Sequence, residues 1–173
     1  MADRASSACA ETVRALHEAG VRPEGLAEYV PESRRLLVLR RPATMRPIGE
    51  AWRLGALLLD TGGRLYAVGR ATRAAERGRL GYQSNSREER RDLAAAALRG
   101  GYPEGAPVDF DALPLPLTAE GLAGLDPGAP IGVHDGAVRV RWRAGAPLEG
   151  APTLGQYLAE RAELLIHPPL GAS

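Results

Sequence analysis

The chain has 173 residues, 45% of them hydrophobic and 25% charged, and its formal net charge is +1. These are the proportions of a globular protein, and the length lets one domain bury about two thirds of its unfolded surface. The sequence excludes an intrachain disulfide, because it holds one cysteine, and it shows neither a signal-peptide core nor the roughly 18-residue apolar run of a membrane span. We therefore expect a single cytoplasmic domain over residues 1–173, without a membrane partner.

The charged residues are unevenly distributed along the chain. All 22 basic residues are arginine, and Ser33–Arg91 holds fourteen of them against five acidic residues, which gives this central block a net charge of +9. The flanks Met1–Glu32 and Asp92–Ser173 carry −3 and −5. Clustered arginines favour an anionic partner. The block is also neutralised if the acidic flanks fold back over it, or if a second copy covers it. The pI of about 8.0 favours this alternative, because nucleic-acid-binding domains usually exceed about 9.

The N-terminal quarter predicts a helix, a helical turn and a strand. The helix covers Ala8–Ala19 and ends at Gly20, a typical residue for a helix C-terminus. Pro23 favours a short helical turn within Arg22–Tyr29. Arg34–Arg41 has an apolar centre between paired arginines and predicts one strand with charged ends.

Turn residues mark two hairpins. Ala51–Leu59 and Arg64–Val68 are apolar runs joined by the turn sequence Asp-Thr-Gly-Gly. Ile131–His134 and Ala137–Arg143 flank Asp135-Gly136, a dipeptide that a type I′ turn favours. The alternation in the last of these runs predicts an apolar face of Val138, Val140 and Trp142, and a solvated face of Arg139, Arg141 and Arg143.

The C-terminal half predicts two helices separated by a loop. Arg87–Arg99 follows a Ser-x-x-Glu capping box that begins at Ser86, and two glycines end it. Gly101–Pro130 is rich in proline and glycine and predicts a long ordered loop with one short turn near Thr118–Ala123. The last helix covers Thr153–Ile166. Together the elements predict an α+β fold: a mainly antiparallel sheet of four to six strands with helices packed on one face.

Leu57–Gly62 resembles the signature of aspartic proteases, in which an apolar strand runs into Asp-Thr-Gly and two such aspartates share a proton. The resemblance covers about six residues. The following residues depart from the family pattern, because they lead directly into a partner strand and no apolar-apolar-Gly motif closes the lobe. An aspartate at a hairpin turn is ordinary turn chemistry, so we interpret Asp60 as a turn residue.

Residues 69–91 hold a dense group of arginines and lead into the N-terminus of a predicted helix, whose unpaired amides favour anions. From this we predict an anion- or partner-binding site made of Arg70, Arg73, Arg77, Arg79, Tyr82, Ser84, Arg87 and Tyr102. The alternative is a solvated surface segment whose arginines form salt bridges, since Glu88 and Glu89 already occupy the first turn of the helix.

Aromatic residues near a basic segment are typical of surfaces that stack on single-stranded nucleic acid. They make up only 5% of this chain, so we assign Trp52, Tyr66 and Trp142 to the core. Tyr82 and Tyr102 flank the predicted helix in glycine-rich loops, and we expect these two side chains to be exposed contacts.

Catalytic and metal-binding patterns are weak. His17, His134 and His167 are scattered without the spacing of metal ligands, and Cys9 has no neighbouring cysteine or histidine. We therefore predict no metal, no cofactor and an inert thiol.

The charge distribution predicts a non-catalytic binding or assembly module. Its central arginines would engage an anionic ligand, an acidic protein or a second copy in a homodimer. One alternative is a small enzyme for a phosphorylated or carboxylated metabolite, with Asp109 or Asp111 as acid or base and the anion held by Arg70, Arg73, Arg79 and Arg87. A nucleic-acid-binding protein is a further alternative.

Overall fold

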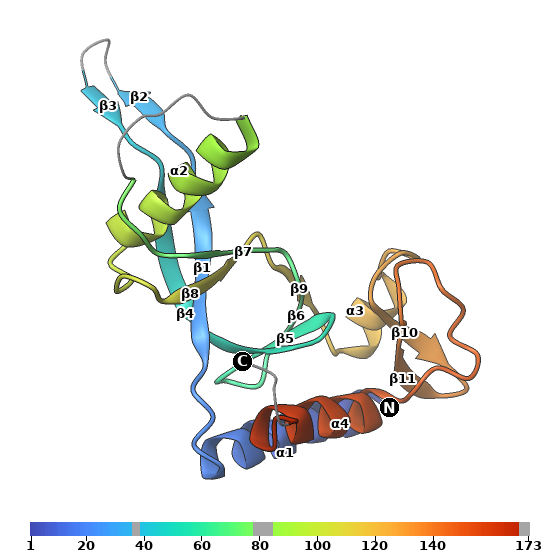
Figure 1. Ribbon diagram of the computed structural model, residues 1–173. Helices are drawn as coiled ribbons and strands as arrows, with labels where there is room; N and C mark the ends of the chain where they lie inside the picture. Colours follow the sequence, from blue (N-terminus) through green and yellow to red (C-terminus); the bar gives the residue numbers. More distant parts are fainter. Residues whose placement is uncertain (36–38, 78–84, 170–173) are drawn as a thin grey trace. The chain divides into compact units, whose positions relative to one another are not determined.

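The computed structural model describes residues 1–35, 39–77 and 85–169, whose helices and strands are shown in Figure 1. The chain divides into two compact units. Unit 1 comprises Met1–Pro23, Ala51–Val68 and Leu113–Ser173, and unit 2 comprises Glu24–Glu50 and Gly69–Ala112. The expectation of a single domain remains a prediction.

Four helices and eleven strands are described. In chain order they are α1 (Ala2–Glu18), β1 (Glu24–Val30), β2 (Ser33–Arg35), β3 (Leu39–Arg41), β4 (Thr44–Leu54), β5 (Leu57–Asp60), β6 (Leu65–Ala67), β7 (Arg70–Arg73), α2 (Asn85–Arg99), β8 (Pro107–Phe110), β9 (Leu113–Leu115), α3 (Ala119–Ala123), β10 (Ile131–His134), β11 (Ala137–Val140) and α4 (Leu154–Ile166). Among the described residues, no helix has the length and apolar character needed to cross a bilayer.

The α+β class is confirmed, but the predicted sheet is wrong in size and in strand direction. Seven strands form one mixed sheet in the order β7-β8-β1-β4-β5-β6-β9. Its β1 and β8 run parallel, with Leu26 opposite Asp109, whereas β7 pairs antiparallel to β8. The difference arises in Gly101–Pro130, predicted as a loop, because this segment supplies both β8 and β9 as well as the short helix α3.

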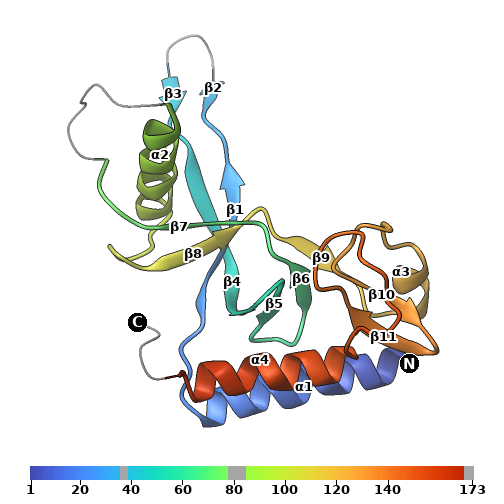
Figure 2. The ribbon, with the colours of Figure 1, turned by 45° about the vertical axis from the view of Figure 1, so that its right-hand side comes forward.

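In unit 1, helices α1 and α4 lie side by side and run in the same direction (Figure 2). Helix α1 begins six residues earlier than predicted, and its buried residues recur every three to four positions: Ala5, Cys9, Thr12 and Leu16. Gly20 adopts a left-handed φ of 69°, and the amides of Gly20 and Val21 donate to the carbonyls of His17 and Leu16. This is a Schellman motif, so the predicted helix end is confirmed.

Helix α4 is confirmed with nearly the predicted bounds. The sequence analysis missed its capping box, in which Thr153 accepts from the amide of Gln156 and the Gln156 side chain accepts from the amide of Thr153. Leu154 and Leu158 are buried, whereas Leu164 and Leu165 are exposed.

The core of unit 1 combines residues of α1 and α4 with residues of strands β4, β5 and β6. The predicted strand Ala51–Leu59 is divided into β4 and β5, because Gly55 has a φ of 64° and turns the chain. The Tyr157 hydroxyl accepts from the amide of Ala56 at 2.9 Å and lies where a side chain at position 55 would be. Trp52 is buried as predicted, and its indole donates to the carbonyl of Val21.

The second hairpin of unit 1 is confirmed in place and turn type. Asp135 and Gly136 have φ values of 49° and 67°, as a type I′ turn requires. Trp142 was assigned wrongly to the core: it lies beyond β11 and is 73% exposed. The solvated face was also wrong in part, because Arg139 and Arg141 are half-buried and donate to backbone carbonyls of the neighbouring loops.

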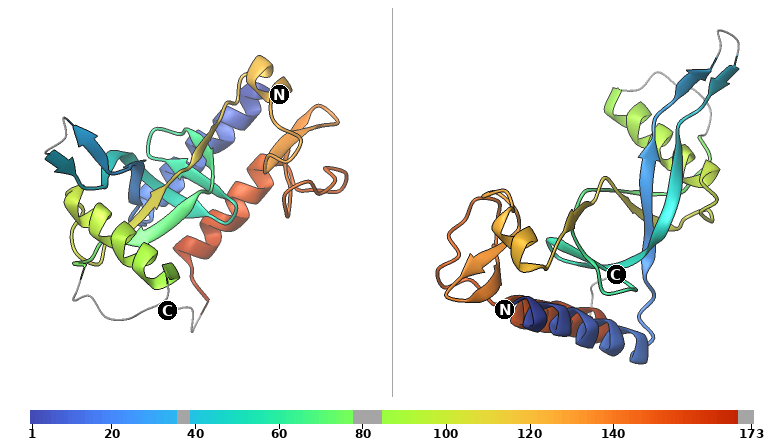
Figure 3. Two further views of the ribbon diagram at one scale, coloured as in Figure 1. Left: turned by 90° about the horizontal axis from the view of Figure 1, so that it is seen from above. Right: turned by 180° about the vertical axis from the view of Figure 1, so that it is seen from behind.

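Unit 2 begins with two corrections. The predicted helical turn within Arg22–Tyr29 is instead strand β1, and the predicted strand Arg34–Arg41 is two strands, β2 and β3. These two strands pair antiparallel, with Ser33 opposite Arg41, and continue from β1 and β4 (Figure 3).

Helix α2 packs a small apolar face in unit 2. Leu93, Ala96 and Ala97 join Met45 and Phe110 in one buried cluster. The helix begins at Asn85, two residues before the predicted start, so Ser86 is a helical residue and the prediction that it caps the helix is wrong.

Candidate functional site

The predicted arginine site lies in unit 2, and part of it can be placed. Arg70 and Arg73 are on β7, Arg77 follows that strand, and Arg87 is in the first turn of α2. All four side chains are exposed. The predicted site residues Arg79, Tyr82 and Ser84 lie outside the described residues.

Three of these arginines bind groups of their own chain. Arg70 donates through Nη2 to Glu89 Oε1 at 2.7 Å, and its Nη1 lies 3.8 Å from Asp111 Oδ2. The Nε of Arg77 is 2.8 Å from Asp92 Oδ1. Arg73 donates to the carbonyl of Gly105. The structure thus brings Arg70 close to Asp111, one of the two carboxylates that the enzyme alternative named.

The surface beside Arg70 is unsuited to an anion. A cavity of about 480 Å³ is lined by Tyr29, Arg70, Glu88, Glu89, Asp92 and Leu93. Three carboxylates against one guanidinium repel a negative ligand. The described part of this segment therefore favours the salt-bridged surface over the anion site.

The fold also disperses the charge of the central block. Unit 2 contains thirteen arginines and eleven acidic residues, a net charge of +2, and unit 1 contains nine arginines and ten acidic residues, a net charge of −1. The acidic partners Asp92 and Asp111 come from the C-terminal flank, and Glu28, which pairs with Arg46, comes from the N-terminal flank. Three acidic residues of the flanks thus pair with arginines of the basic block, and neutralisation of the whole block by the flanks stays a prediction.

Two further predicted residues have structural surroundings. Tyr102 was expected to be an exposed contact, but its ring is half-buried against Gly25 and its hydroxyl donates to the carbonyl of Leu26 at 3.0 Å. Burial, and to a lesser degree the charge of Glu50, raises the pKa of its phenol. Asp109, a candidate acid or base, is fully buried on β8.

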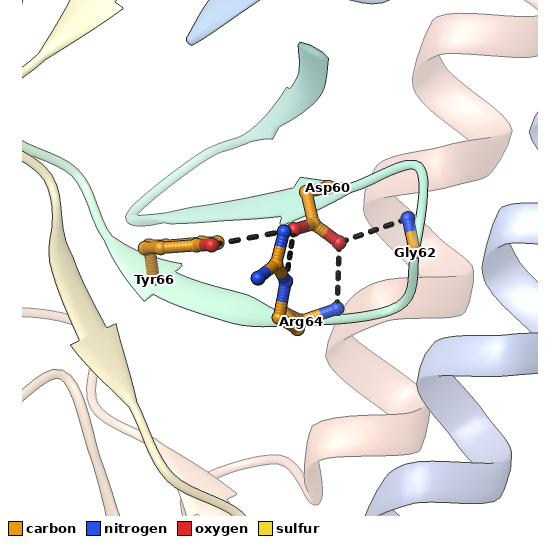
Figure 4. Close-up of polar contacts among 4 residues, drawn as sticks. All are labelled: Asp60, Gly62, Arg64 and Tyr66. Carbon is orange, nitrogen blue, oxygen red and sulfur yellow. Dashed lines mark hydrogen bonds and ion pairs between the residues drawn. The ribbon is translucent and has the colours of Figure 1, made fainter. Parts of the chain in front are cut away.

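The best-organised polar group of the described residues lies in unit 1, at the turn between β5 and β6 (Figure 4). Asp60 is 3% exposed, and its Oδ1 accepts from the amides of Gly62 and Arg64 at 2.9 and 2.8 Å. Its Oδ2 accepts from Arg64 Nε at 2.7 Å and from the Tyr66 hydroxyl at 3.3 Å.

The local sequence explains this arrangement. Asp60 ends a buried strand, its carboxylate binds the amide two residues later as in an Asx-turn, and Gly63 supplies a φ of 85°. The Asp-Thr-Gly sequence that resembles aspartic proteases therefore forms a hairpin turn, as interpreted, with four donors around its carboxylate. Sequence reasoning missed Arg64; the available signal was an arginine four residues after a turn aspartate.

The polar contacts fix the charge states around Arg64. The hydrogen bond that Arg64 donates to Asp60, together with the negative charge of that carboxylate, raises the pKa of the Arg64 guanidinium, so this group is always charged. Burial is the main cause that raises the pKa of Tyr66, whose phenol stays neutral at physiological pH. Arg64 is nevertheless 72% exposed at its side chain.

Arg64 and Tyr66 line a cavity of about 410 Å³. Ser6 of α1, Gly63, Leu65 and residues 114–117 complete the lining, most of which is leucine and proline. Of these residues Leu115 is buried and Leu117 half-buried. The site therefore combines one oriented cation with an apolar wall.

Strand β9 forms one edge of the seven-stranded sheet and borders this cavity. Pro114 lies opposite Tyr66 and has no N–H, so the ladder bonds with β6 are made by the flanking pairs Leu65–Leu115 and Ala67–Leu113. The outer edge then has proline at positions 114 and 116, where added strands would need donors. This edge is closed to strand addition.

No protein-family model matches the chain, and comparisons with curated proteins and with solved structures likewise find no significant match. The site must therefore be interpreted from its own chemistry. Among the described residues, no three histidine, cysteine or acidic side chains come together in a way that could hold a metal ion.

Proposed function

We propose that the protein is a non-catalytic binding module that engages an anionic partner through an arginine of the central block, and that this arginine is Arg64. The observation that carries the proposal is the pairing of an exposed guanidinium with a buried carboxylate at the rim of a cavity. The cation is held in place before any ligand arrives, so a ligand does not have to order a flexible side chain.

The chemistry of the donors supports the same proposal. A guanidinium has five N–H donors, and Asp60 engages the one on Nε. Among the described residues, the Nη groups of Arg64 have no hydrogen-bonded acceptor. An anion bound there would meet two donors in a planar arrangement that suits a carboxylate or phosphate.

Two alternatives keep less support. The enzyme alternative needs a carboxylate beside an anion site; Asp109 is buried, and Asp111 does lie 3.8 Å from Arg70, but Glu88, Glu89 and Asp92 disfavour an anion there. Self-association would use exposed apolar residues such as Leu113 and Trp142.

The experiment is a binding screen at low ionic strength with chloride-free buffers. The probes are inorganic phosphate, a panel of carboxylates, a glutamate-rich peptide and single-stranded DNA, each titrated against the wild type, Arg64→Gln and Arg70→Gln. We expect at least one anion to bind the wild type, with the affinity lost in Arg64→Gln and kept in Arg70→Gln.

The matched variant makes the result specific, because each substitution removes one guanidinium that pairs with a carboxylate. Absence of binding by every anion would refute the proposal. Loss of binding in Arg70→Gln alone would move the site to unit 2.

A further inference from the structure

We propose that the ligand of the Arg64 cavity is a small organic monocarboxylate with an apolar alkyl or aryl body. This inference rests on the proposed function, because it names the class of anion that the same site takes.

The local charge favours a single negative charge on the ligand. Arg64 and Asp60 form an ion pair at 2.7 Å, so together they contribute no net charge. Among the described residues that line this cavity, Arg64 is the one cation. A dianion such as a phosphate monoester brings twice the charge of a carboxylate to a site without net positive charge, so the carboxylate is disfavoured less and still meets the paired donors of the guanidinium.

The walls favour an apolar body behind that carboxylate. Leu115 and Leu117 alternate with Pro114 and Pro116, and none of these four side chains carries a polar group. The volume of about 410 Å³ lies within the range of about 300–1,000 Å³ that is typical of small-molecule sites. Burying hydrocarbon against these walls would supply the affinity that one exposed ion pair lacks.

The sheet edge favours a small molecule over an extended peptide. A peptide that binds as an added strand needs main-chain donors from the edge, and Pro114 and Pro116 remove them on the outer side of β9. The recognition elements that remain are one oriented guanidinium and apolar side chains.

The test compares three probes that separate charge from body. Octanoate has both, acetate has only the carboxylate, and octanamide has only the apolar body. Isothermal titration calorimetry and ¹H–¹⁵N NMR on the full chain should show octanoate binding with a Kd on the order of 1 mM, as expected for ten heavy atoms. Acetate and octanamide should each bind at least about tenfold more weakly.

The variants assign the binding to this cavity. Ser6 is an exposed residue of α1 that lines the cavity, so Ser6→Trp should fill the opening without disturbing the core, and octanoate binding should be lost. Ser7→Trp is the matched control, because Ser7 is exposed on the same helix and does not line the cavity. Arg64→Gln should weaken octanoate by at least about tenfold, because it removes the charge and the paired donors that hold the carboxylate. Arg64→Gln also leaves Asp60 without its cation and can therefore lower stability. Ser6→Trp does not touch this ion pair, so its result is independent of that loss.

The outcomes separate this inference from the proposed function. If acetate or phosphate binds as tightly as octanoate, and this binding depends on Arg64, the claim that the ligand has an apolar body is overturned. The proposed anion-binding function then stands. Octanamide binding as tightly as octanoate overturns both. Equal binding by Ser6→Trp and Ser7→Trp places the ligand elsewhere and overturns the assignment. If the protein is a dimer and octanoate dissociates it, the cavity is occupied by a second copy of the chain. This result also overturns the assignment of the cavity to a monocarboxylate.

Discussion

In unit 1, Arg64 is bound through one N–H by a buried carboxylate and lines an apolar cavity, whereas in unit 2 Arg70 and Arg77 pair with exposed carboxylates on the surface. The two regions thus contain the same residue type with opposite consequences. In unit 2 the carboxylates that pair with Arg70 and Arg77 are themselves exposed, and Glu88 adds a further negative charge beside Arg70. In unit 1 a single carboxylate orients the cation and leaves the Nη groups for a ligand.

The comparison teaches that the density of arginine along a sequence does not locate a binding site. In the described part of the arginine-dense segment, Arg70 and Arg77 already pair with Glu89, Asp111 and Asp92. A more isolated arginine becomes the better candidate because its partner is buried and its surroundings are apolar.

The largest effect should come from removing the buried carboxylate of unit 1. Asp60→Ala leaves the Tyr66 hydroxyl and two backbone amides without their acceptor. We expect the free energy of unfolding to fall by about 3 kcal/mol in urea denaturation. The control is Asp126→Ala, because Asp126 also binds an amide two residues on but is exposed, and its cost should stay below about 1 kcal/mol. Similar losses in both variants would contradict the account.

A smaller effect is expected where α2 approaches strand β4 in unit 2. A Cβ at position 100 would lie 2.0 Å from the carbonyl oxygen of Met45, so Gly100→Ala must displace the end of the helix. We expect a loss of about 2 kcal/mol in unfolding free energy. Gly124→Ala is the control, since its nearest non-neighbouring atom is at 3.6 Å, and it should change stability by no more than about 0.5 kcal/mol. Equal effects would show that this helix end does not pack as described.

The pH dependence of stability should report the buried thiol of unit 1. Burial raises the pKa of Cys9 to about 11, above the value of 9.0 for a free thiol. The neutral thiol therefore contributes stability that is fully present below pH 9 and is lost as the pH rises toward 11. Urea denaturation between pH 8 and 11 should show a shallower decline for Cys9→Ala than for the wild type. Identical slopes would indicate that the thiol ionises equally in both states.

The smallest effect should come from the surface pairs of unit 2. Arg70→Gln removes an exposed ion pair, which is usually worth less than about 1 kcal/mol, so stability should change by about 0.5 kcal/mol. The salt dependence of unfolding should also weaken slightly. A loss of 2 kcal/mol or more would mean that Arg70 holds unit 2 together in a way the exposed contacts do not explain.

Local signals predicted part of this fold. The sequence predicted the glycine at the end of α1, the type I′ turn at Asp135-Gly136 and the last helix. Each of these features depends on residues a few positions apart. The parallel pairing of β1 with β8 was not readable, because it joins residues some eighty positions apart. Gly55 dividing one apolar run into two strands was missed for a similar reason: its turn is held by the distant Tyr157.

The candidate site was less predictable than the fold. Asp60 was correctly interpreted as a turn residue, but its role in orienting Arg64 depends on burial that the turn sequence does not encode. The walls of the cavity come from α1 and from residues 114–117, which the sequence placed in a loop. The arginines of unit 2 were predicted as site residues from the sequence. The carboxylates that pair with Arg70 and Arg77 were not predicted as their partners, because they are up to about forty positions away in the chain.

The most direct measurement is an NMR titration of the arginine side-chain Nε–H resonances with octanoate, assigned by the variants Arg64→Gln, Arg70→Gln and Arg77→Gln. The account predicts that the Arg64 resonance moves with saturating dependence on octanoate while those of Arg70 and Arg77 stay in place. A stationary Arg64 resonance, or shifts at Arg70 and Arg77 in its stead, would contradict it.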